Sequence, residues 1–330
     1  IPDLALQISA WQHQFADLFG DAALQRVRGF SLPEMHLANH PDTLFALVNS
    51  LLEAGYRWLL VQEHSVEQLD GSPLSCQQRF VPNRLVARSS SGEVVSITAL
   101  IKTQGSDTKL VGQMQPCEEA FGLSRQRLGN VEIPSLVSQI ADGENGGVMM
   151  NEFPEAFRQA NRRIRDSTPD TAALNGSEYL ELLEAMGLKT SDLPSIQAVH
   201  QHRLWQRVGE AGGGESVATS IEELSSANDG FSMEGASWTN NLSWVEGYDN
   251  VLQPMQRFSA SFHQQFDQQL SEQPRLSQTP VFRDALMHLL LLETSCFRYW
   301  GQGQWTDYAQ AIHTMGNMHL KRAEDHLPPP

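Results

Sequence analysis

Residues 27–64 read VRGFSLPEMHLANHPDTLFALVNSLLEAGYRWLLVQEH, with two short apolar segments on either side of a helix-forming segment. The first apolar segment, Val27–Phe30, runs toward Pro33, which interrupts a strand because proline has no backbone N–H. Thr43–Glu53 carries leucine and valine at helical spacing, and the unbroken apolar run Trp58–Val61 is typical of a strand buried on both faces. This order predicts a strand–helix–strand unit with parallel strands.

Acidic side chains follow both strands of this unit. Glu34 stands where the first strand stops, and Glu63 and His64 come directly after the second. The apolar segment Ser135–Ala141 is predicted to be another buried strand, and it precedes the sequence DGENGG at positions 142–147. Because ligands bind at the carboxyl ends of parallel strands, we expect these acids at one edge of the sheet.

The rest of the chain divides into an α/β part and a helical part. Further strands are expected at Leu85–Ala87 and Val94–Leu100, and helices at Leu4–Phe19, Thr108–Phe121, Pro154–Arg165, Val251–Leu270, Pro280–Tyr299 and Trp305–Leu327. The Gly-, Ser- and Glu-rich residues 211–230 are expected to be a loop or flexible insertion. We therefore expect a barrel part over residues 1–200, and a loop insertion with a helical bundle over residues 201–330.

Composition excludes several classes of protein. The 330 residues carry a formal net charge of −16, and this field repels nucleic acid. The three cysteines lie far apart in the sequence, which argues against a disulfide framework and favours a reducing, cytoplasmic location. No apolar run reaches the roughly 18 residues of a membrane span. The first residue is Ile1 and not Met, so we expect a fragment that lacks its natural start.

Two carboxyl groups at one edge of a sheet suit the cleavage of glycosidic bonds. A retaining glycosidase uses one ionised carboxylate as nucleophile and one protonated carboxyl as acid/base, about 5–5.5 Å apart. Mutual repulsion raises the pKa of one group while the other stays ionised. The glycines around Asp142 and Glu144 let a ligand approach the backbone closely. Taken singly, each acid also fits a solvated loop position or a helix cap.

Two segments, in this order, resemble glycoside hydrolase family 57. GFSLPEM at 29–35 is similar to the family's strand that ends in the nucleophile, and ADGENGG at 141–147 is similar to its Asp-Gly-Glu motif. The resemblance implies a retaining α-glucan hydrolase or transglycosylating enzyme without a metal or organic cofactor. Glu34 would be the nucleophile, Asp142 the acid/base, and Glu144 a neighbour that tunes its charge.

The same resemblance implies an α/β fold with an incomplete (β/α)7-type barrel, of the glycoside hydrolase and deacetylase type, before the helical region. Two features depart from the family pattern. Ser31 stands where the family usually has tryptophan, and no early strand with an H-Q-P-type motif precedes Glu34. We therefore expect the first strands of the barrel to be missing from this chain.

Other residues are candidates for contact with an α-glucan or oligosaccharide. Polar candidates for sugar hydroxyls are His36, His64, Glu63 and Glu144, and candidates for stacking on sugar rings are Trp238, Trp244 and Trp300. The tryptophans fit equally well as anchors of their loops on the core. The sequence leaves the oligomeric state open.

Two other functions fit these residues. A metal-dependent carbohydrate deacetylase would need an Asp and two His, drawn from Asp142 with His36, His40 and His64. His36 and His40 are four residues apart, but Pro41 places them in a loop and not along a helix, so we expect no metal site. A non-catalytic carbohydrate-binding relic is the third reading, favoured by Ser31 and the missing strands.

Overall fold

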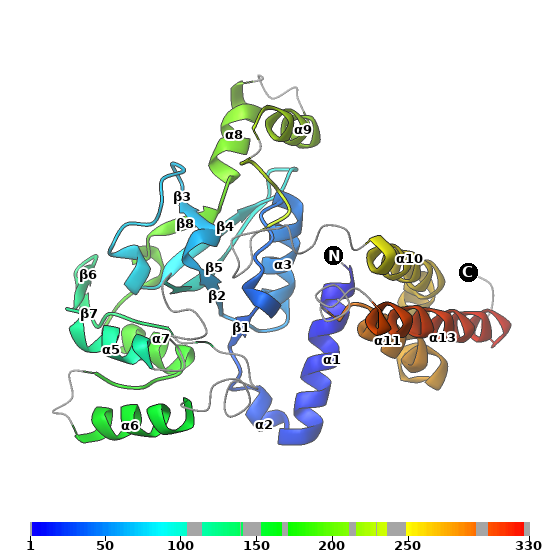
Figure 1. The fold of residues 1–330 in the computed structure, drawn as a ribbon, viewed down its shortest axis with the longest axis horizontal. Coiled ribbons are helices and arrows are strands. Elements are labelled where there is room, and N and C mark those ends of the chain that lie inside the picture. The colour runs from blue at the N-terminus through cyan, green and yellow to red at the C-terminus, as the bar shows by residue number, and fades with distance from the viewer. Residues whose placement is uncertain are drawn as a thin grey trace. The chain divides into compact units, whose positions relative to one another are not determined.

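The computed structural model describes residues 2–103, 114–138, 140, 153–166, 171–210, 216–228, 230–235, 249–294 and 303–326. The chain forms two compact units, Ile1–Asn240 and Asn241–Pro330 (Figure 1). The first unit is mixed α/β and the second is helical. The units divide later in the chain than residue 200. The boundary expected at residue 200 separates a barrel part from a loop insertion and helical bundle, and that division stays a prediction.

Six strands of the first unit form one mixed sheet in the order β1-β2-β5-β4-β8-β3 (Figure 1). The strands are β1 (Gly29–Ser31), β2 (Trp58–Gln62), β3 (Val66–Gln68), β4 (Asn83–Arg88), β5 (Val94–Lys102) and β8 (Ser195–Ala198). Strands β1, β2 and β5 are parallel, β4 runs antiparallel to β5 and parallel to β8, and β8 is antiparallel to β3. The strand–helix–strand unit predicted for residues 27–64 is confirmed.

Helices cover both faces of this sheet. Helix α3 (Pro41–Glu53) joins β1 to β2 and buries Leu51 against Leu59 of β2 in the main core cluster. Because successive side chains of a strand point to opposite faces, Leu60 faces the other side. There it packs in a second cluster with residues of α7 (Gly176–Ala185). Residues 58–61 are apolar without alternation because both faces of the sheet are buried here.

The connection between β2 and β3 requires the sheet to curl. Val66 of β3 comes four residues after Gln62 of β2, yet β5, β4 and β8 lie between the two strands in the sheet. In a flat sheet, four spacings of about 4.8 Å would separate them by about 19 Å. Four extended residues span at most about 14 Å. The short connection between β2 and β3 therefore requires the sheet to curl, so that its two ends approach each other. A complete (β/α)7-type barrel stays a prediction.

Residues 134–138 differ from the sequence-based expectation. They follow the hairpin of β6 (Gln126–Leu128) and β7 (Val131–Ile133) without regular secondary structure. The Leu136 N–H donates to the carbonyl of Phe80 at 2.8 Å, and the Ser138 hydroxyl donates to the carbonyl of Ile101 at 2.9 Å. These are single anchors on two different elements and not a ladder, so the strand expected at Ser135–Ala141 is wrong over residues 135–138.

The polar segment 211–230 also differs, because residues Val217–Ala227 form helix α9. Ser216 caps this helix, since its hydroxyl accepts from the Thr219 N–H at 3.1 Å. Ile221 and Leu224 of α9 pack in one cluster around Leu204 of α8 (Gln201–Glu210). The expectation of a loop is therefore wrong for residues 217–227, while residues 211–215 lie outside the described part.

Other helices of the first unit are α1 (Pro2–Phe19), α2 (Asp21–Leu24), α5 (Gln115–Gly122) and α6 (Phe153–Asp166). The helices predicted for residues 4–19 and 154–165 are confirmed. Helix α5 starts later than expected because Met114 has a φ of +60°, which a helix cannot contain, and Pro116 favours a start beside it. Residues 104–113 lie outside the described part.

The second unit packs α10 (Asp249–Glu272), α11 (Pro280–Leu292) and α13 (Gln304–His326) against one another. Its core contains Phe258, Phe262 and Phe266 of α10, all fully buried, and Phe262 and Phe266 contact Phe282 of α11. The expected helical region is confirmed, although α11 ends at Leu292 and before Tyr299. In the described part of the chain, no helix combines the length and the hydropathy needed to cross a bilayer.

Candidate functional site

The ends of β1 and β2 bring two of the expected acids to one edge of the sheet. Ser31 of β1 pairs with Leu60 of β2 in parallel register. Glu34 comes three residues after Ser31, in a 3-10 turn formed by Pro33–Met35, and Glu63 comes three residues after Leu60. Both acids therefore lie in turns that follow the carboxyl ends of neighbouring parallel strands, and β1 ends opposite Leu60, two residues before β2 ends at Gln62.

The turn that contains Glu34 has an unusual backbone. Met35 adopts a φ of +50°, in the left-handed region that residues other than glycine rarely occupy. Its side chain is buried, as is that of Leu32 on the other side of the turn. A non-glycine residue in this conformation costs about 1–3 kcal/mol and persists only where the surroundings hold it. The packing of Leu32 and Met35 is part of that support.

Glu63 and Glu119 form a pair of carboxyl groups in different environments. The carboxylate of Glu63 lies 2.9 Å from the guanidinium Nε of Arg79 as an ion pair, and its side chain is 15% exposed. Glu119 belongs to α5 and is partly buried. Burial first, and then the negative charge of Glu63, raise the pKa of Glu119. The sequence offered no signal for Glu119, because its relation to Glu63 exists only in the folded chain.

The end of β5 adds a cation to the same edge. Lys102 pairs with Gln62 in the parallel ladder, and both side chains are buried. Just before them, the Ile101 carbonyl accepts the hydrogen bond from Ser138. The chain that leads to position 142 therefore passes beside the carboxyl end of β5. Asp142 and Glu144 themselves lie outside the described residues, as do Trp238, Trp244 and Trp300.

The three histidines considered from the sequence lie near these strand ends. The ring Nε2 of His36 lies 3.0 Å from the Glu234 carbonyl, His40 directly precedes α3, and His64 belongs to the turn Glu63–Ser65. Among the described residues, no three His, Cys, Asp or Glu side chains gather in a metal-binding arrangement. The set of Asp142 with two of these histidines, which a metal-dependent deacetylase would need, includes a residue outside the described part of the chain.

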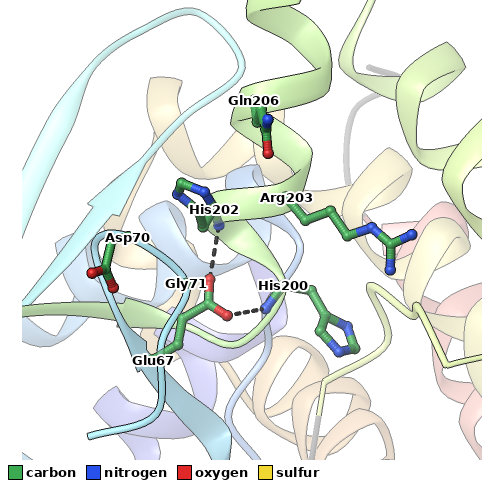
Figure 2. A pocket seen from close by; sticks show the side chains of 7 residues that line it. All are labelled: Glu67, Asp70, Gly71, His200, His202, Arg203 and Gln206. Carbon is green, nitrogen blue, oxygen red and sulfur yellow. Dashed lines mark hydrogen bonds between the residues drawn. The ribbon is translucent and has the colours of Figure 1, made fainter. Parts of the chain in front are cut away.

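A polar pocket of about 390 Å³ lies between the turn after β3 and α8 (Figure 2). Its lining residues are Glu67, Asp70, Gly71, His200, His202, Arg203 and Gln206. The Glu67 carboxylate accepts from the backbone N–H groups of His200 at 3.0 Å and His202 at 2.8 Å, as Figure 2 shows. Glu67 thus caps the start of α8, where the helix dipole favours a negative charge.

Most polar groups of this pocket serve the local structure. The hydroxyl and N–H of Ser72 both donate to the Asp70 carboxylate, and these bonds lower the pKa of Asp70. The Nδ1 of His202 lies 3.0 Å from the Leu69 carbonyl. The sequence offered no signal for this pocket, because the turn-rich segment with Glu67 and Asp70 meets the start of α8 only in the folded chain. We assign the pocket no chemical step.

Comparison with known proteins found no matching family model and no matching curated protein. Among solved structures, the chain is similar to the 4-alpha-glucanotransferase from Thermococcus litoralis, with a TM-score of 0.46 and 16% sequence identity. The similarity covers 96% of this chain and 43% of that protein, so this chain spans less than half the length of the glucanotransferase.

Proposed function

We propose that the protein is a carbohydrate-active enzyme, a retaining glycoside hydrolase or transglycosylating enzyme that acts on α-glucans. Glu34 is the nucleophile and Asp142 the acid/base. The parallel register of β1 and β2 supports this proposal, because the Glu34 turn then follows a carboxyl edge of the sheet, where Glu63 comes directly after β2 and Lys102 ends β5. Active sites of parallel α/β folds lie at such edges.

The observation that carries the proposal is the hydrogen bond from Ser138 to the Ile101 carbonyl, at 2.9 Å. Asp142 comes four residues after Ser138, so chain length keeps it within about 14 Å of that serine. Strand β1 lies two strand spacings from β5, which is about 10 Å. The chain is therefore long enough for Asp142 to approach Glu34 at the roughly 5–5.5 Å of a retaining mechanism.

The proposed reaction has two steps. Glu34 attacks the anomeric carbon and forms a covalent glycosyl ester, while protonated Asp142 gives its proton to the leaving oxygen. Asp142, now ionised, then takes a proton from water in hydrolysis, or from a sugar hydroxyl in transfer. The oxygen of that molecule attacks the anomeric carbon as the bond to Glu34 breaks, which frees the Glu34 carboxylate. The proposed role of Glu144, two residues after Asp142, is to tune the charge of the acid/base as its neighbour in the motif.

The remaining candidates are proposed to bind the glucan. His36, His64 and Glu63 would hydrogen-bond sugar hydroxyls, and Trp238, Trp244 and Trp300 would stack on sugar rings. This chemistry needs neither a metal nor an organic cofactor. Its charges come from carboxyl groups alone.

The test uses Glu34→Gln and Asp142→Asn on maltooligosaccharides. We expect Asp142→Asn to lower kcat by about 10²–10⁴-fold, because it removes proton transfer. A 2-fluoro glycosyl fluoride should label Glu34 covalently, which mass spectrometry detects, and Glu34→Gln should abolish that label. Glu132→Gln changes an exposed acid of β7 and should leave turnover unchanged. Normal turnover by both active-site variants would overturn the proposal.

A further inference from the structure

The amide of Asn39 joins three segments that are far apart in the sequence. Its Nδ2 donates to the Val199 carbonyl at 3.0 Å and to the Ser232 carbonyl at 2.8 Å. Its Oδ1 accepts from the N–H of Gly235 at 2.8 Å. Asn39 is 1% exposed, so these bonds form away from water. Both donors and the acceptor of the amide are used, which fixes its orientation.

Neighbouring bonds strengthen the same junction. The backbone carbonyl of Asn39 accepts a hydrogen bond from the buried side chain of Gln201. His36 Nε2 lies 3.0 Å from the Glu234 carbonyl. Gly235 has a φ of +94°, and a Cβ at this position would lie 2.6 Å from His36 Nε2. The backbone at Gly235 and the side chain of His36 therefore approach each other as closely as glycine allows.

The segment 231–235 is itself firmly held, so it can act as a support. Phe231 and Met233 are buried around Leu204 of α8. The ring of His200 stacks on Phe231, with 5.3 Å between ring centroids, and His200 Nδ1 lies 3.0 Å from the Ser232 carbonyl. The loop that contains Asn39 is thus tied to a packed part of the same compact unit.

We propose that Asn39 is a positioning residue for Glu34, and that its bonds to Ser232 and Gly235 hold the turn Pro33–Met35 in its reactive orientation. The proposal rests on the proposed function. The left-handed backbone of Met35 needs such support, because β1 ends at Ser31 on one side of the turn. On the other side, the loop up to α3 is held by Asn39 and His36.

The consequence for catalysis follows from geometry. A displacement of about 1 Å in a reacting group can cost about 10²-fold in rate. Asn39→Ala removes three hydrogen bonds from the loop while Glu34 itself is kept. We expect kcat to fall by about 10–10²-fold, with KM changing much less, because substrate contacts remain. The rate of covalent labelling by the 2-fluoro glycosyl fluoride should fall in parallel with kcat.

Asn83 provides a matched control. It is fully buried, and its Nδ2 donates to the carbonyls of Gln78 at 2.8 Å and Val81 at 2.9 Å, so Asn83→Ala removes similar bonds. Neither of these two bonds involves the loop between Glu34 and α3. Both variants should lose thermal stability, but only Asn39→Ala should lose labelling rate when each is assayed well below its Tm. Equal losses of labelling rate would overturn the proposal.

Asn39→Asp supplies a second readout, the pH profile. An ionised Asp at this position keeps the acceptor for Gly235 but faces the carbonyls of Val199 and Ser232 without a proton to donate. Protonation returns one donor. The ratio of its kcat to that of the wild type should therefore rise as pH falls, and a constant ratio would contradict the role proposed here. If the wild type itself shows no turnover or label, the proposed function fails. If only Asn39→Ala keeps full kcat, this inference alone fails.

Discussion

The guanidinium Nε of Arg79 lies 2.9 Å from the Oε1 of Glu63, and this ion pair joins the turn Gln78–Phe80 to the end of β2. The Glu63 side chain is 15% exposed and that of Arg79 is 39% exposed. The pair therefore lies at the rim of the sheet edge, where solvent screens part of the attraction. Its expected contribution is about 0.5–1 kcal/mol.

Arg79→Gln is expected to lower the free energy of unfolding by about 1 kcal/mol at low salt, because Glu63 loses its ion pair with Arg79 while most of its surface stays covered. At about 1 M salt the Debye length is only about 3 Å, so the loss should be smaller. Urea unfolding at the two salt concentrations measures both values. Arg26→Gln replaces an exposed arginine and should leave the free energy of unfolding unchanged at both salt concentrations. An equal loss at both salt concentrations would contradict an electrostatic role.

Glu119 predicts a pH dependence of stability. Burial and the charge of Glu63 raise its pKa, so the folded chain keeps this proton to a higher pH than the unfolded chain does. Between the ordinary carboxyl pKa of about 4.3 and the higher folded value, the folded state binds more protons, and stability falls as pH rises. Glu119→Gln removes this loss, so its Tm should gain on the wild type as pH rises from about 4 to about 7.

The control for this prediction is the same substitution in a Glu63→Gln background. There the second cause of the raised pKa is absent, so the gain of Glu119→Gln with pH should shrink. Thermal unfolding at several pH values gives both series. A gain that is the same in both backgrounds would show that Glu63 does not act on Glu119.

Local sequence signals predicted the elements that carry Glu34 and Glu63 of the candidate site. Pro33 and the helical spacing of residues 43–53 gave the strand–helix–strand unit, and parallel strands must then end at one edge. Composition misled at residues 211–230, because Ser and Glu suggested a loop. Ser216 with Val217, Ile221 and Leu224 already carried a helix cap and an apolar stripe.

Contacts between residues that are far apart in the chain could not be predicted from the sequence. A short segment such as residues 135–138, with Leu136 and Val137 between two serines, does not reveal whether a ladder partner exists. Here its hydrogen bonds go to two carbonyls on different elements. Strand β8 is only four residues long, with too little alternation to recognise. The contact of Asn39 with Gly235 spans 196 residues and depends on the packing of both segments. Only the folded chain shows it.

Trp58 explains a strict need for glycine in β1. A Cβ at Gly29 would lie 1.9 Å from the Trp58 ring, and one at Gly176 would lie 2.5 Å from it. The indole N–H donates to the Ser177 hydroxyl at 3.0 Å, so the ring is fixed from the side of α7. The indole therefore fills the space between β1 and the start of α7.

Gly29→Ala is accordingly expected to lower the free energy of unfolding by about 1–3 kcal/mol, because Trp58 must shift in a packed core. Gly209→Ala is the matched control. It lies inside α8 with nothing within 4 Å of an added Cβ, so alanine should stabilise by about 0.5–1 kcal/mol. Urea unfolding measures both, and a neutral Gly29→Ala would show that Trp58 moves without cost.

The surroundings of His313 predict that the helical unit loses stability in acid. Burial first, and then the positive charge of Arg257, lower its pKa, and its Nε2 lies 3.1 Å from Nδ2 of Asn317, which donates to a neutral ring. The unfolded chain takes up this proton near pH 6.5 while the folded chain resists it, so stability falls as pH drops below about 6.5. His313→Gln should lose less Tm over that range than the wild type. The loss of Tm of Arg257→Gln should lie between those of the wild type and His313→Gln, because burial still opposes protonation of His313. Parallel curves for all three proteins would rule His313 out as the titrating group.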